Sequence, residues 1–359
     1  MSTQHVDLVV VGLGPAGASA ARAAAAGGCR VVAVDRRLEA GYPVQCAELV
    51  PGLVGQDVAT FAATLRQPVR RMLTRVEDAP ADERSPFPGF MIDRGRFDRE
   101  LVDAARAAGA DCRFAEAVVA IDDTGGVRLA SGAVLRGRVL IGADGPLSRV
   151  GRAIGAVNRE LVHARQYTVP LREASDATDI FLSADIAGGY GWLFPHGAQA
   201  HLGVGVGRAA RGRLKALLAD LHETLHAEGR VGRGGSALTG GVIPVGGRVA
   251  PSGRIGEVLT LLAGDAAGLV NPVSGAGIHA AVVSGRLAGE AAAAWQDGDR
   301  SAADDYAEDI DDLFGRALDH ALARRRRLWA TARPDGAALR AGWIAYPEYW
   351  TRERDGAVA

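Results

Sequence analysis

The chain has 359 residues, of which 48% are hydrophobic, and its formal net charge is −1. This length suits one large or two ordinary domains, and the near-neutral charge gives no electrostatic reason to expect a nucleic-acid partner. The three cysteines form no C-x-x-C pair, so neither a disulfide scaffold nor a metal site is predicted. No apolar run reaches the roughly 20 residues of a membrane helix, and no basic and then apolar leader begins the chain. We therefore expect a cytoplasmic protein, either soluble or bound peripherally to a membrane.

Residues 7–35 have the pattern of a strand, a tight turn, a helix and a second strand. The run D-L-V-V-V-G is rich in β-branched residues, which suits a strand buried on both faces. Gly12, Gly14 and Gly17 follow at the spacing G-x-G-x-x-G, and an alanine-rich helix comes next. Here Gly12 permits the tight turn, Gly14 lets the backbone approach a pyrophosphate, and Gly17 lets the helix pack on the strand. The unit predicts a dinucleotide site.

The helix start and the second strand supply the other predicted contacts with the dinucleotide. Pro15 and Ala16 begin the helix, whose N-terminal N–H groups and positive dipole end face the phosphates. The second strand, C-R-V-V-A-V-D, ends at Asp35, which is placed to accept hydrogen bonds from an adenosine ribose, and Arg36 follows it. These residues alone do not distinguish NAD from FAD.

Two later segments favour FAD. Residues 139–155 begin with a short apolar strand that ends in G-A-D-G, in which the carboxylate is Asp144. Residues 259–294 form another strand, which ends at Gly264 and Asp265, and then a loop and a long helix of small residues. Asp265 at a strand end suits a ribityl hydroxyl. The turn before the helix offers N–H groups for charge on the N1/O2 edge of a reduced flavin. This turn comprises Gly275, Ala276, Gly277 and Ile278.

With three motifs in order, at residues 12–17, 142–145 and 264–265, the sequence resembles the FAD-dependent oxidoreductases built like p-hydroxybenzoate hydroxylase. The resemblance implies FAD as the cofactor, with Asp144 near the cofactor phosphates, Asp265 near the ribityl chain and the turn at 275–278 near the pyrimidine ring. No second G-x-G-x-x-G lies between a strand and a helix, so no separate pyridine-nucleotide domain is expected.

Three further segments indicate which family among these FAD-dependent oxidoreductases the sequence resembles. They are P-V-Q-C-A-E at residues 43–48, R-G-R-F-D at residues 94–98 and Y-G-W-L-F-P at residues 190–195. Together they make the sequence similar to the geranylgeranyl reductase family. Ala47 stands where that family often has glycine, and Ala187 stands where the longer form of its third motif has proline. The C-terminal part is also shorter than is common in the family.

The resemblance implies that Cys46 lies near the flavin and the substrate. A thiol at such a place can fill space, donate a proton or act as a redox partner. Glu48 is a second candidate proton donor, and the alternative is a solvated residue at a helix start. Arg94 begins an amphipathic helix, from which its guanidinium can reach phosphate or ribityl oxygens. The alternative for Arg94 is a surface salt bridge.

Tyr190, Trp192 and Phe194 alternate along a predicted strand and therefore point to one face. They predict either a flat apolar wall for an isoprenoid chain or for the flavin's surroundings, or ordinary strand core. Pro195 removes a ladder donor, so the strand is expected to end there. His196, directly after this motif, is assigned to a local hydrogen bond and not to catalysis.

We predict an α/β fold: a Rossmann-like FAD-binding domain with a parallel sheet, a substrate domain with a mixed or antiparallel sheet, and a helical C-terminal tail. The FAD-binding domain is discontinuous. The predicted ranges are 1–75, 91–165 and 254–298 for the FAD-binding domain, 76–90 and 166–253 for the substrate domain, and 299–359 for the tail.

The tail carries an unusual combination of side chains. Arg324 to Arg327 stand close to Trp329, and residues 343–350 contain four aromatic side chains. Basic charge beside aromatic residues suits contact with a membrane surface. A packed lid over the flavin is the alternative.

These features together predict an FAD-dependent reductase of carbon–carbon double bonds in an isoprenoid or similar lipid-like substrate. Hydride passes from reduced flavin to one alkene carbon, while an acid or an ordered water protonates the other. The electron donor is either NAD(P)H or a ferredoxin-type iron–sulfur protein, and no oligomeric state is predicted. The alternatives are an FAD-dependent monooxygenase that uses NAD(P)H and O₂, and a flavin-binding protein without catalysis.

Overall fold

The computed structural model describes residues 3–236 and 238–351. A six-stranded sheet in the order β19-β20-β13-β2-β3-β9 carries the glycine-rich turn. Five of its strands are parallel, and β19 at one edge is antiparallel to its neighbour. The strands are β2 (Leu8–Val11), β3 (Val31–Val34), β9 (Asp111–Arg113), β13 (Val139–Gly142), β19 (Ser252–Ile255) and β20 (Val258–Leu262).

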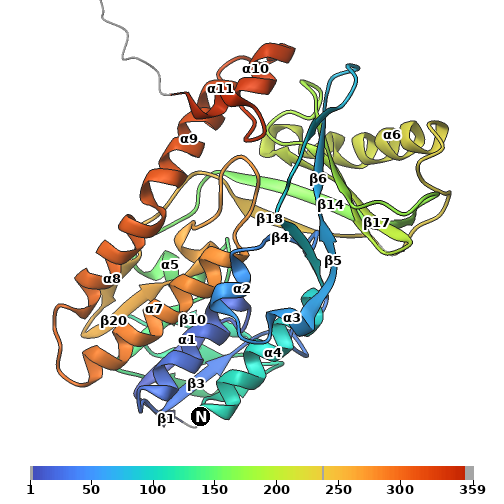
Figure 1. Cartoon of the computed structure of the whole chain (residues 1–359). Helices are drawn as coiled ribbons and strands as arrows, with labels where there is room; N and C mark the ends of the chain where they lie inside the picture. The colour runs from blue at the N-terminus through green and yellow to red at the C-terminus, as the bar shows by residue number, and fades with distance from the viewer. Residues whose placement is uncertain (1–2, 237, 352–359) are drawn as a thin grey trace, which may run out of the picture.

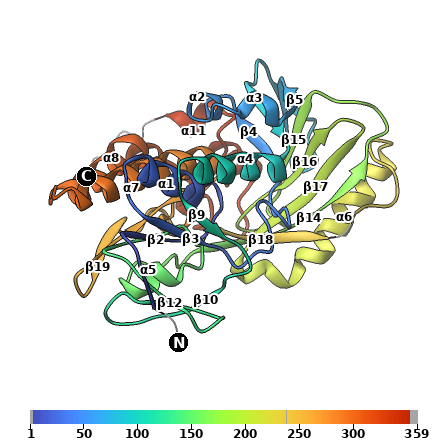
Figure 2. The ribbon, with the colours of Figure 1, turned by 90° about the horizontal axis from the view of Figure 1, so that it is seen from below.

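Both faces of this sheet are covered, which is why its inner strands are apolar at successive positions. Figure 2 shows three helices on one side and a smaller sheet with one short helix on the other. The three helices are α1 (Pro15–Ala26), α4 (Arg94–Ala107) and α7 (Ile278–Gln296). The opposite layer contains β1 (Thr3–His5), β10 (Val118–Ile121), β11 (Val127–Leu129), β12 (Val134–Arg136) and α5 (Arg149–Ala153).

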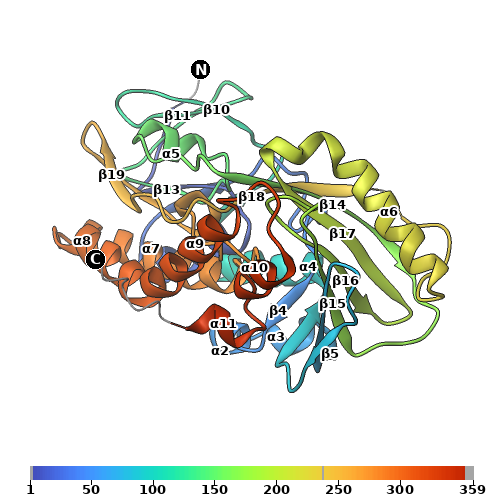
Figure 3. The same ribbon diagram turned by 90° about the horizontal axis from the view of Figure 1, so that it is seen from above.

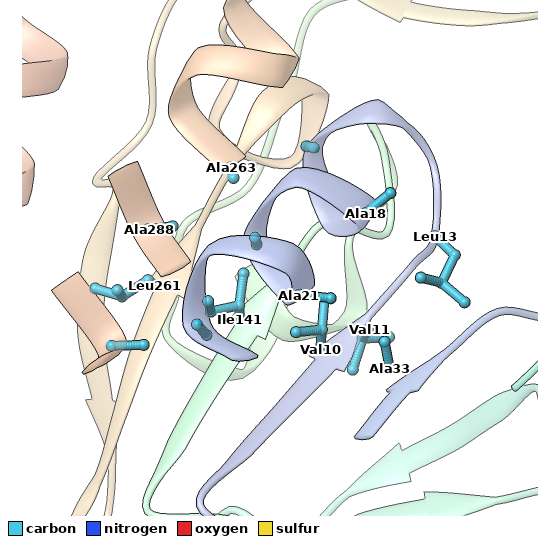
Figure 4. Close-up of a cluster of buried hydrophobic side chains, with 14 of the residues drawn as sticks. Val10, Val11, Leu13, Ala18, Ala21, Ala33, Ile141, Leu261, Ala263 and Ala288 are labelled. Carbon is cyan, nitrogen blue, oxygen red and sulfur yellow. The ribbon is translucent and has the colours of Figure 1, made fainter. Parts of the chain in front are cut away.

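The core beneath the glycine-rich turn is built from small side chains (Figure 4), with Val10 and Ile141 on the strands and Ala21 on α1. Small residues also let α1 and α7 approach closely. A Cβ added at Gly285 of α7 would lie 2.1 Å from the carbonyl oxygen of Ala16. This contact fixes the start of α1, and with it the glycine-rich turn, relative to α7.

A second, seven-stranded sheet has the order β18-β14-β17-β16-β15-β6-β7. Neighbouring strands are antiparallel except for β15 and β6, which are parallel. The strands are β6 (Arg71–Val76), β7 (Asp82–Arg84), β14 (Leu161–Pro170), β15 (Ala177–Leu182), β16 (Gly191–His196), β17 (Gln199–Gly207) and β18 (Thr239–Pro244). Helix α6 (Leu214–Ala227) packs on one face of this sheet through its leucines, after the 3₁₀ turn η1 at residues 208–213.

A three-stranded sheet, β4-β8-β5, follows the P-V-Q-C-A-E segment and precedes α4. Its strands are β4 (Leu49–Pro51), β5 (Leu65–Val69) and β8 (Gly89–Ile92), and the short helices α2 (Val54–Asp57) and α3 (Phe61–Thr64) lie between β4 and β5 in the sequence. Met91 of β8 packs in the same buried cluster as Trp192 of β16, whereas Val50 and Ile92 belong to the core of the parallel sheet. This small sheet therefore connects the two larger ones.

The C-terminal part is helical and returns to the seven-stranded sheet. Figure 1 shows the helices, coloured orange to red, extending from α7 toward β6. They are α8 (Ala302–Ile310), α9 (Arg316–Leu328), α10 (Gly336–Ala341) and α11 (Pro347–Trp350), with a π-helical turn at residues 311–315 between α8 and α9. Trp343 and Tyr346 lie in the same buried cluster as Trp192 and Phe194 of β16, and in the view of Figure 3 α9 and α10 appear between α7 and the seven-stranded sheet. The tail is therefore packed against the second sheet, and a lid over the flavin stays a prediction.

The predicted α/β class is confirmed: a parallel nucleotide-binding sheet, a mixed second sheet and a helical tail are all present. The seven-stranded sheet also takes residues 71–76 and 161–170, most of which the predicted ranges place with the FAD-binding domain. The division into domains stays a prediction, and residues 352–359 of the predicted tail lie outside the described residues. None of the described helices combines the length and the apolar composition that a membrane crossing requires.

Candidate active site

The glycine-rich turn joins β2 to α1. Gly12 has a φ of +98°, and a Cβ there would lie 2.3 Å from the Ala143 carbonyl oxygen, so the turn and the G-A-D-G segment touch. A Cβ at Gly17 would lie 1.8 Å from the carbonyl oxygen of Gly12. At Gly14, the N-cap of α1, an added Cβ would meet no protein atom within 4 Å. The open side of Gly14 at a helix N-terminus is therefore a cradle of the kind that a pyrophosphate fits.

Asp35 follows β3 and is buried beside this turn. Its carboxylate accepts hydrogen bonds from the backbone N–H of Leu13 at 2.8 Å and from that of Arg37 at 2.8 Å. One bond falls on each oxygen, so each oxygen retains acceptor capacity for a ribose hydroxyl. The side chain of Arg36 is exposed. Asp35 thus both ties the turn to β3 and fits the predicted ribose contact.

Asp144 lies at the end of β13 and interacts mainly with its own turn. Its carboxylate accepts hydrogen bonds from the Ser148 hydroxyl and from the Arg149 backbone N–H at 2.6 Å, which closes the start of α5. Burial raises the pKa of Asp144, although these hydrogen bonds oppose the shift. The structure therefore places Asp144 next to the glycine-rich turn in a role that shapes the backbone, and its contact with cofactor phosphate stays a prediction.

Asp265 has an environment that fits a polyol. Among residues 3–236 and 238–351, its backbone carbonyl accepts from Asn158 at 2.8 Å, but no protein group donates a hydrogen bond to its carboxylate. Burial raises its pKa, and the positive charge of Arg94 opposes this. A Cβ at Gly277, the N-cap of α7, would lie 3.5 Å from Asp265 Oδ1, so Asp265 faces the predicted flavin turn. The hydroxyls of a ribityl chain would supply the missing donors.

We expect Asp265→Asn to stabilise the FAD-free protein increasingly as pH rises. The raised pKa means that the folded state disfavours the ionised carboxylate. The contribution of the neutral Asp265 side chain to the free energy of unfolding is therefore fully present below the ordinary pKa of 3.8. It is lost as pH rises through the pKa of the folded state. Thermal unfolding of both FAD-free proteins between pH 3.5 and 8 should show melting temperatures that coincide at low pH and separate above it. A separation that shrinks with rising pH would contradict this account.

Cys46, Arg94 and Asp265 converge although they are distant in the sequence. Arg94 is largely buried at the first turn of α4, and its Nε lies 2.7 Å from Asp98 Oδ1. Burial acts against its charge, but Asp98 and the adjacent Cys46 raise the pKa of Arg94 above its ordinary value. The Cys46 carbonyl accepts from Gln166 Nε2 of β14 at 2.7 Å. The loop carrying the thiol is therefore attached to the seven-stranded sheet while the thiol faces a guanidinium.

Glu48 is buried and its carboxylate has a partner on each oxygen. Oε1 accepts from the Arg94 backbone N–H at 2.8 Å, and Oε2 lies 2.7 Å from His201 Nε2. Burial alone would raise its pKa, but these hydrogen bonds together with the charges of His201 and Arg66 hold the pKa below its ordinary value. The environment favours the carboxylate, which suits a positioning group better than a proton donor. Sequence reasoning missed His201, because it lies 153 residues from Glu48 in the chain and only the folding of the sheet brings the two side chains together.

Trp192 and Phe194 of β16 share one face of the sheet, as predicted, and Tyr190, directly before the strand, packs against the same buried cluster. The rings of Trp192 and Phe194 are 6.1 Å apart, and Tyr190 lies 4.9 Å from Trp343 of the tail. The Tyr190 hydroxyl donates to the Ser274 carbonyl at 2.6 Å, which ties the aromatic strand to the flavin turn at 275–278.

The predicted end of the strand at Pro195 is wrong by one residue, since β16 continues to His196. Pairing with β15 stops at Leu193, so Pro195 has a neighbouring strand on one side and its missing N–H is tolerated.

No protein-family model matches the chain. Digeranylgeranylglycerophospholipid reductase 2 of Methanopyrus kandleri is 35% identical over 338 residues, which cover 88% of this chain and 85% of that protein. Digeranylgeranylglycerophospholipid reductase of Methanoculleus marisnigri is 34% identical over 314 residues, covering 80% of this chain and 76% of the relative. The chain belongs to the geranylgeranyl reductase family. The resemblance read from the three segments is thereby confirmed.

Solved structures agree with this geranylgeranyl reductase family assignment. A geranylgeranyl bacteriochlorophyll reductase-like protein from Thermoplasma acidophilum matches with a TM-score of 0.83 and 25% identity, over 94% of this chain and 90% of that one. A probable FAD-dependent monooxygenase from Pseudomonas aeruginosa shares the fold, with a TM-score of 0.71 at 19% identity over 94% of this chain and 98% of that one. This family member is therefore an enzyme of the FAD-dependent oxidoreductase class, and its glycine cradle, Asp35 and Asp265 fit that cofactor.

Proposed function

We propose that this geranylgeranyl reductase family member reduces carbon–carbon double bonds in the isoprenoid chains of a glycerophospholipid-like substrate. The observation that carries the proposal is the position of Cys46. Its thiol adjoins Arg94, whose charge also acts on Asp265, and Ala47, the next residue, packs against the cluster that contains Trp192 and Phe194. The nucleotide-binding sheet and the apolar wall thus meet at this loop. The substrate class follows from the names of the relatives.

The proposed roles divide the reaction among these residues. The chemistry that FAD would supply when bound and reduced is a hydride for one alkene carbon. Cys46 is the proposed proton donor to the other carbon, with an ordered water as the alternative, and the Arg94 guanidinium stabilises the thiolate that remains. Glu48 accepts a hydrogen bond from the Arg94 backbone N–H, so it positions Arg94 at the start of α4. An unactivated alkene needs a dry, ordered site, which the buried rings of Trp192 and Phe194 support.

A small pocket between Leu182 of β15, the Gly189–Tyr190 segment before β16 and the C-terminal helices is the proposed entrance for the isoprenoid chain. Tyr190, Leu339 and Trp343 are among its apolar lining residues, and Arg325 lies at its wall. Arg325 donates to the carbonyls of Gly188 at 2.8 Å and Pro272 at 3.2 Å, and burial lowers its pKa to about 10. The pocket has a free volume of about 20 Å³, room for about one water molecule, so the C-terminal helices would have to move for an isoprenoid chain to enter.

The electron donor in this proposal is NAD(P)H or a ferredoxin-type protein, and contact with a membrane surface is the proposed route to a lipid substrate. The decisive test is anaerobic. The purified holoprotein is photoreduced, geranylgeranyl glycerophospholipids are added, and flavin reoxidation and saturated products are followed. Reoxidation with product formation under nitrogen supports a reductase. Turnover only with oxygen and incorporation of an oxygen atom indicates a monooxygenase, and a reduced flavin that no substrate reoxidises indicates a non-catalytic flavoprotein.

We expect Cys46→Ser to keep FAD but to slow substrate-dependent reoxidation by about 10²- to 10⁴-fold, the usual contribution of a positioned proton donor. A hydroxyl is a much weaker acid than a thiol, so the proton transfer should become limiting. Stopped-flow absorbance of the reduced flavin measures the rate. The control is Cys29→Ser, because Cys29 packs against the core of the nucleotide-binding sheet. Equal rates in wild type and Cys46→Ser would remove Cys46 from the mechanism.

A further inference from the structure

Three potential metal-binding side chains from separate elements meet beside the Cys46 loop. Glu48 directly precedes β4, His196 ends β16 and His201 lies in β17. One nitrogen or oxygen atom of each side chain lies within 4.8 Å of the other two. Glu48 and His201 are buried and His196 is partly buried, so their positions are fixed by the fold. Such a cluster differs from the acidic groups common on protein surfaces.

Hydrogen bonds orient two of the three side chains from behind. Glu48 Oε1 is held by the Arg94 backbone N–H at 2.8 Å, which leaves Oε2 facing His201 Nε2 at 2.7 Å. On the other side of its ring, His201 Nδ1 lies 3.2 Å from the Thr168 hydroxyl. In the structure Nε2 is hydrogen-bonded to Glu48 Oε2, and a bound metal ion would replace the proton between these two atoms. The remaining ring proton, on Nδ1, would then be donated to Thr168. Support of this kind behind a histidine is typical of metal ligands.

His196 supplies a second, independent observation. In the described part of the chain its ring nitrogens have no hydrogen-bond partner, which contradicts the local hydrogen bond expected from the sequence. Its ring instead packs on that of His201, with centroids 4.6 Å apart and an interplanar angle of 38°. An imidazole with no protein partner, held next to a carboxylate and a second imidazole, offers a free lone pair toward them.

We propose that Glu48, His196 and His201 form a binding site for a divalent transition-metal ion such as Zn²⁺. Two imidazoles and one carboxylate form a donor set that suits Zn²⁺, Co²⁺ or Ni²⁺, whereas Mg²⁺ and Ca²⁺ prefer oxygen ligands alone. Three protein ligands leave one tetrahedral position for water. Arg66, whose charge acts on Glu48 and His196, is paired with Asp93 at 3.2 Å, which limits its repulsion of an ion. This metal site is a property beyond the proposed reductase function. The spacing of Glu48, His196 and His201 in the sequence does not indicate a metal site.

The site predicts stoichiometric Zn²⁺ binding by the full-length holoprotein. After treatment with a chelator and desalting, equilibrium dialysis against Zn²⁺ should give one ion per chain, and Mg²⁺ at the same concentration should not compete. Zn²⁺ should also raise the melting temperature, because a ligand that binds only the folded state stabilises it. His196→Ala should weaken Zn²⁺ affinity at least about tenfold. Because its ring makes no hydrogen bond, this variant should keep its FAD.

The controls separate this site from other sources of binding. His163→Ala changes a partly buried histidine of β14 outside the cluster and should leave Zn²⁺ affinity unchanged. His201→Asn should lose Zn²⁺ affinity, and its FAD content reports whether it folds. Cys46→Ser should retain one Zn²⁺, whereas a loss there would assign the ion to the thiol and overturn the proposal. The absence of saturable binding in wild type, or equal affinity in His196→Ala, would also overturn it.

Discussion

Gly14→Asp is expected to abolish FAD retention while leaving the FAD-free protein folded. Gly14 is the N-cap of α1 with a φ of −76°, a conformation open to any residue, and an added Cβ meets no protein atom within 4 Å. Aspartate is itself a favoured N-cap. In the holoprotein, however, its carboxylate would occupy the predicted pyrophosphate cradle. Repulsion between two charges about 4 Å apart near a protein surface is about 4 kcal/mol, or about a thousandfold in affinity.

The measurement is FAD content after purification, followed by titration of the FAD-free protein with FAD. Gly212→Asp is the matched control, since Gly212 also has open space at its Cβ position but lies in the turn before α6, far in sequence from the nucleotide motif. That variant should retain FAD fully. If Gly14→Asp bound FAD with wild-type affinity and melted at the same temperature, the phosphate cradle would have to lie elsewhere.

Gly285→Leu should have the largest effect on the stability of the fold. The Cβ of any residue at 285 would lie 2.1 Å from the Ala16 carbonyl oxygen, and the obstacle is backbone, which cannot rotate aside. Helices α1 and α7 must therefore separate. Overpacking of this kind typically costs 1–3 kcal/mol and occasionally more, so we expect a loss of about 3 kcal/mol and, for a chain of 359 residues, a melting temperature lower by about 4 °C.

The same substitution should weaken FAD binding, because α7 begins at the flavin turn and α1 begins at the phosphate cradle. Differential scanning calorimetry of the FAD-free protein isolates the effect on folding, and FAD titration then gives the effect on binding. Gly212→Leu adds the same side chain at an open position and should melt close to wild type. Equal melting temperatures for Gly285→Leu and Gly212→Leu would show that the helices pack less closely than described.

Local sequence signals were sufficient to locate the turn, strand end and helix start of the predicted nucleotide site. The turn from Gly12 to Gly17, the carboxylate Asp35 and the helix start at Arg94 are each determined by residues within one βαβ unit or one helix cap, and all lie where predicted. Alternation along a strand likewise predicted that Trp192 and Phe194 share a face. In each case the physical cause acts over a few residues, so its pattern is visible in the chain itself.

The contacts of Glu48 could not be predicted from local sequence patterns. Its partner His201 lies in a strand whose register against β14 and β16 brings it to Glu48, and no periodicity in the sequence encodes that register. The attachment of Cys46 to Gln166 has the same origin. Similarly, Trp343 could be seen as aromatic, but its packing against Tyr190 depends on the path of the whole tail. These are long-range contacts, and they needed the folded structure.

In the described residues, the backbone passes between the parallel sheet and the seven-stranded sheet four times, from β3 to β6, β7 to β9, β13 to β14 and β18 to β19. Two domains joined by one linker can rotate apart about a hinge at that linker. Several backbone connections at different points resist rotation about any single hinge axis. The proposed lipid substrate would then be admitted by displacement of smaller parts at the edge of the site. The C-terminal helices that cover Trp192 reach the second sheet through one connection only. They are therefore the elements that can be displaced.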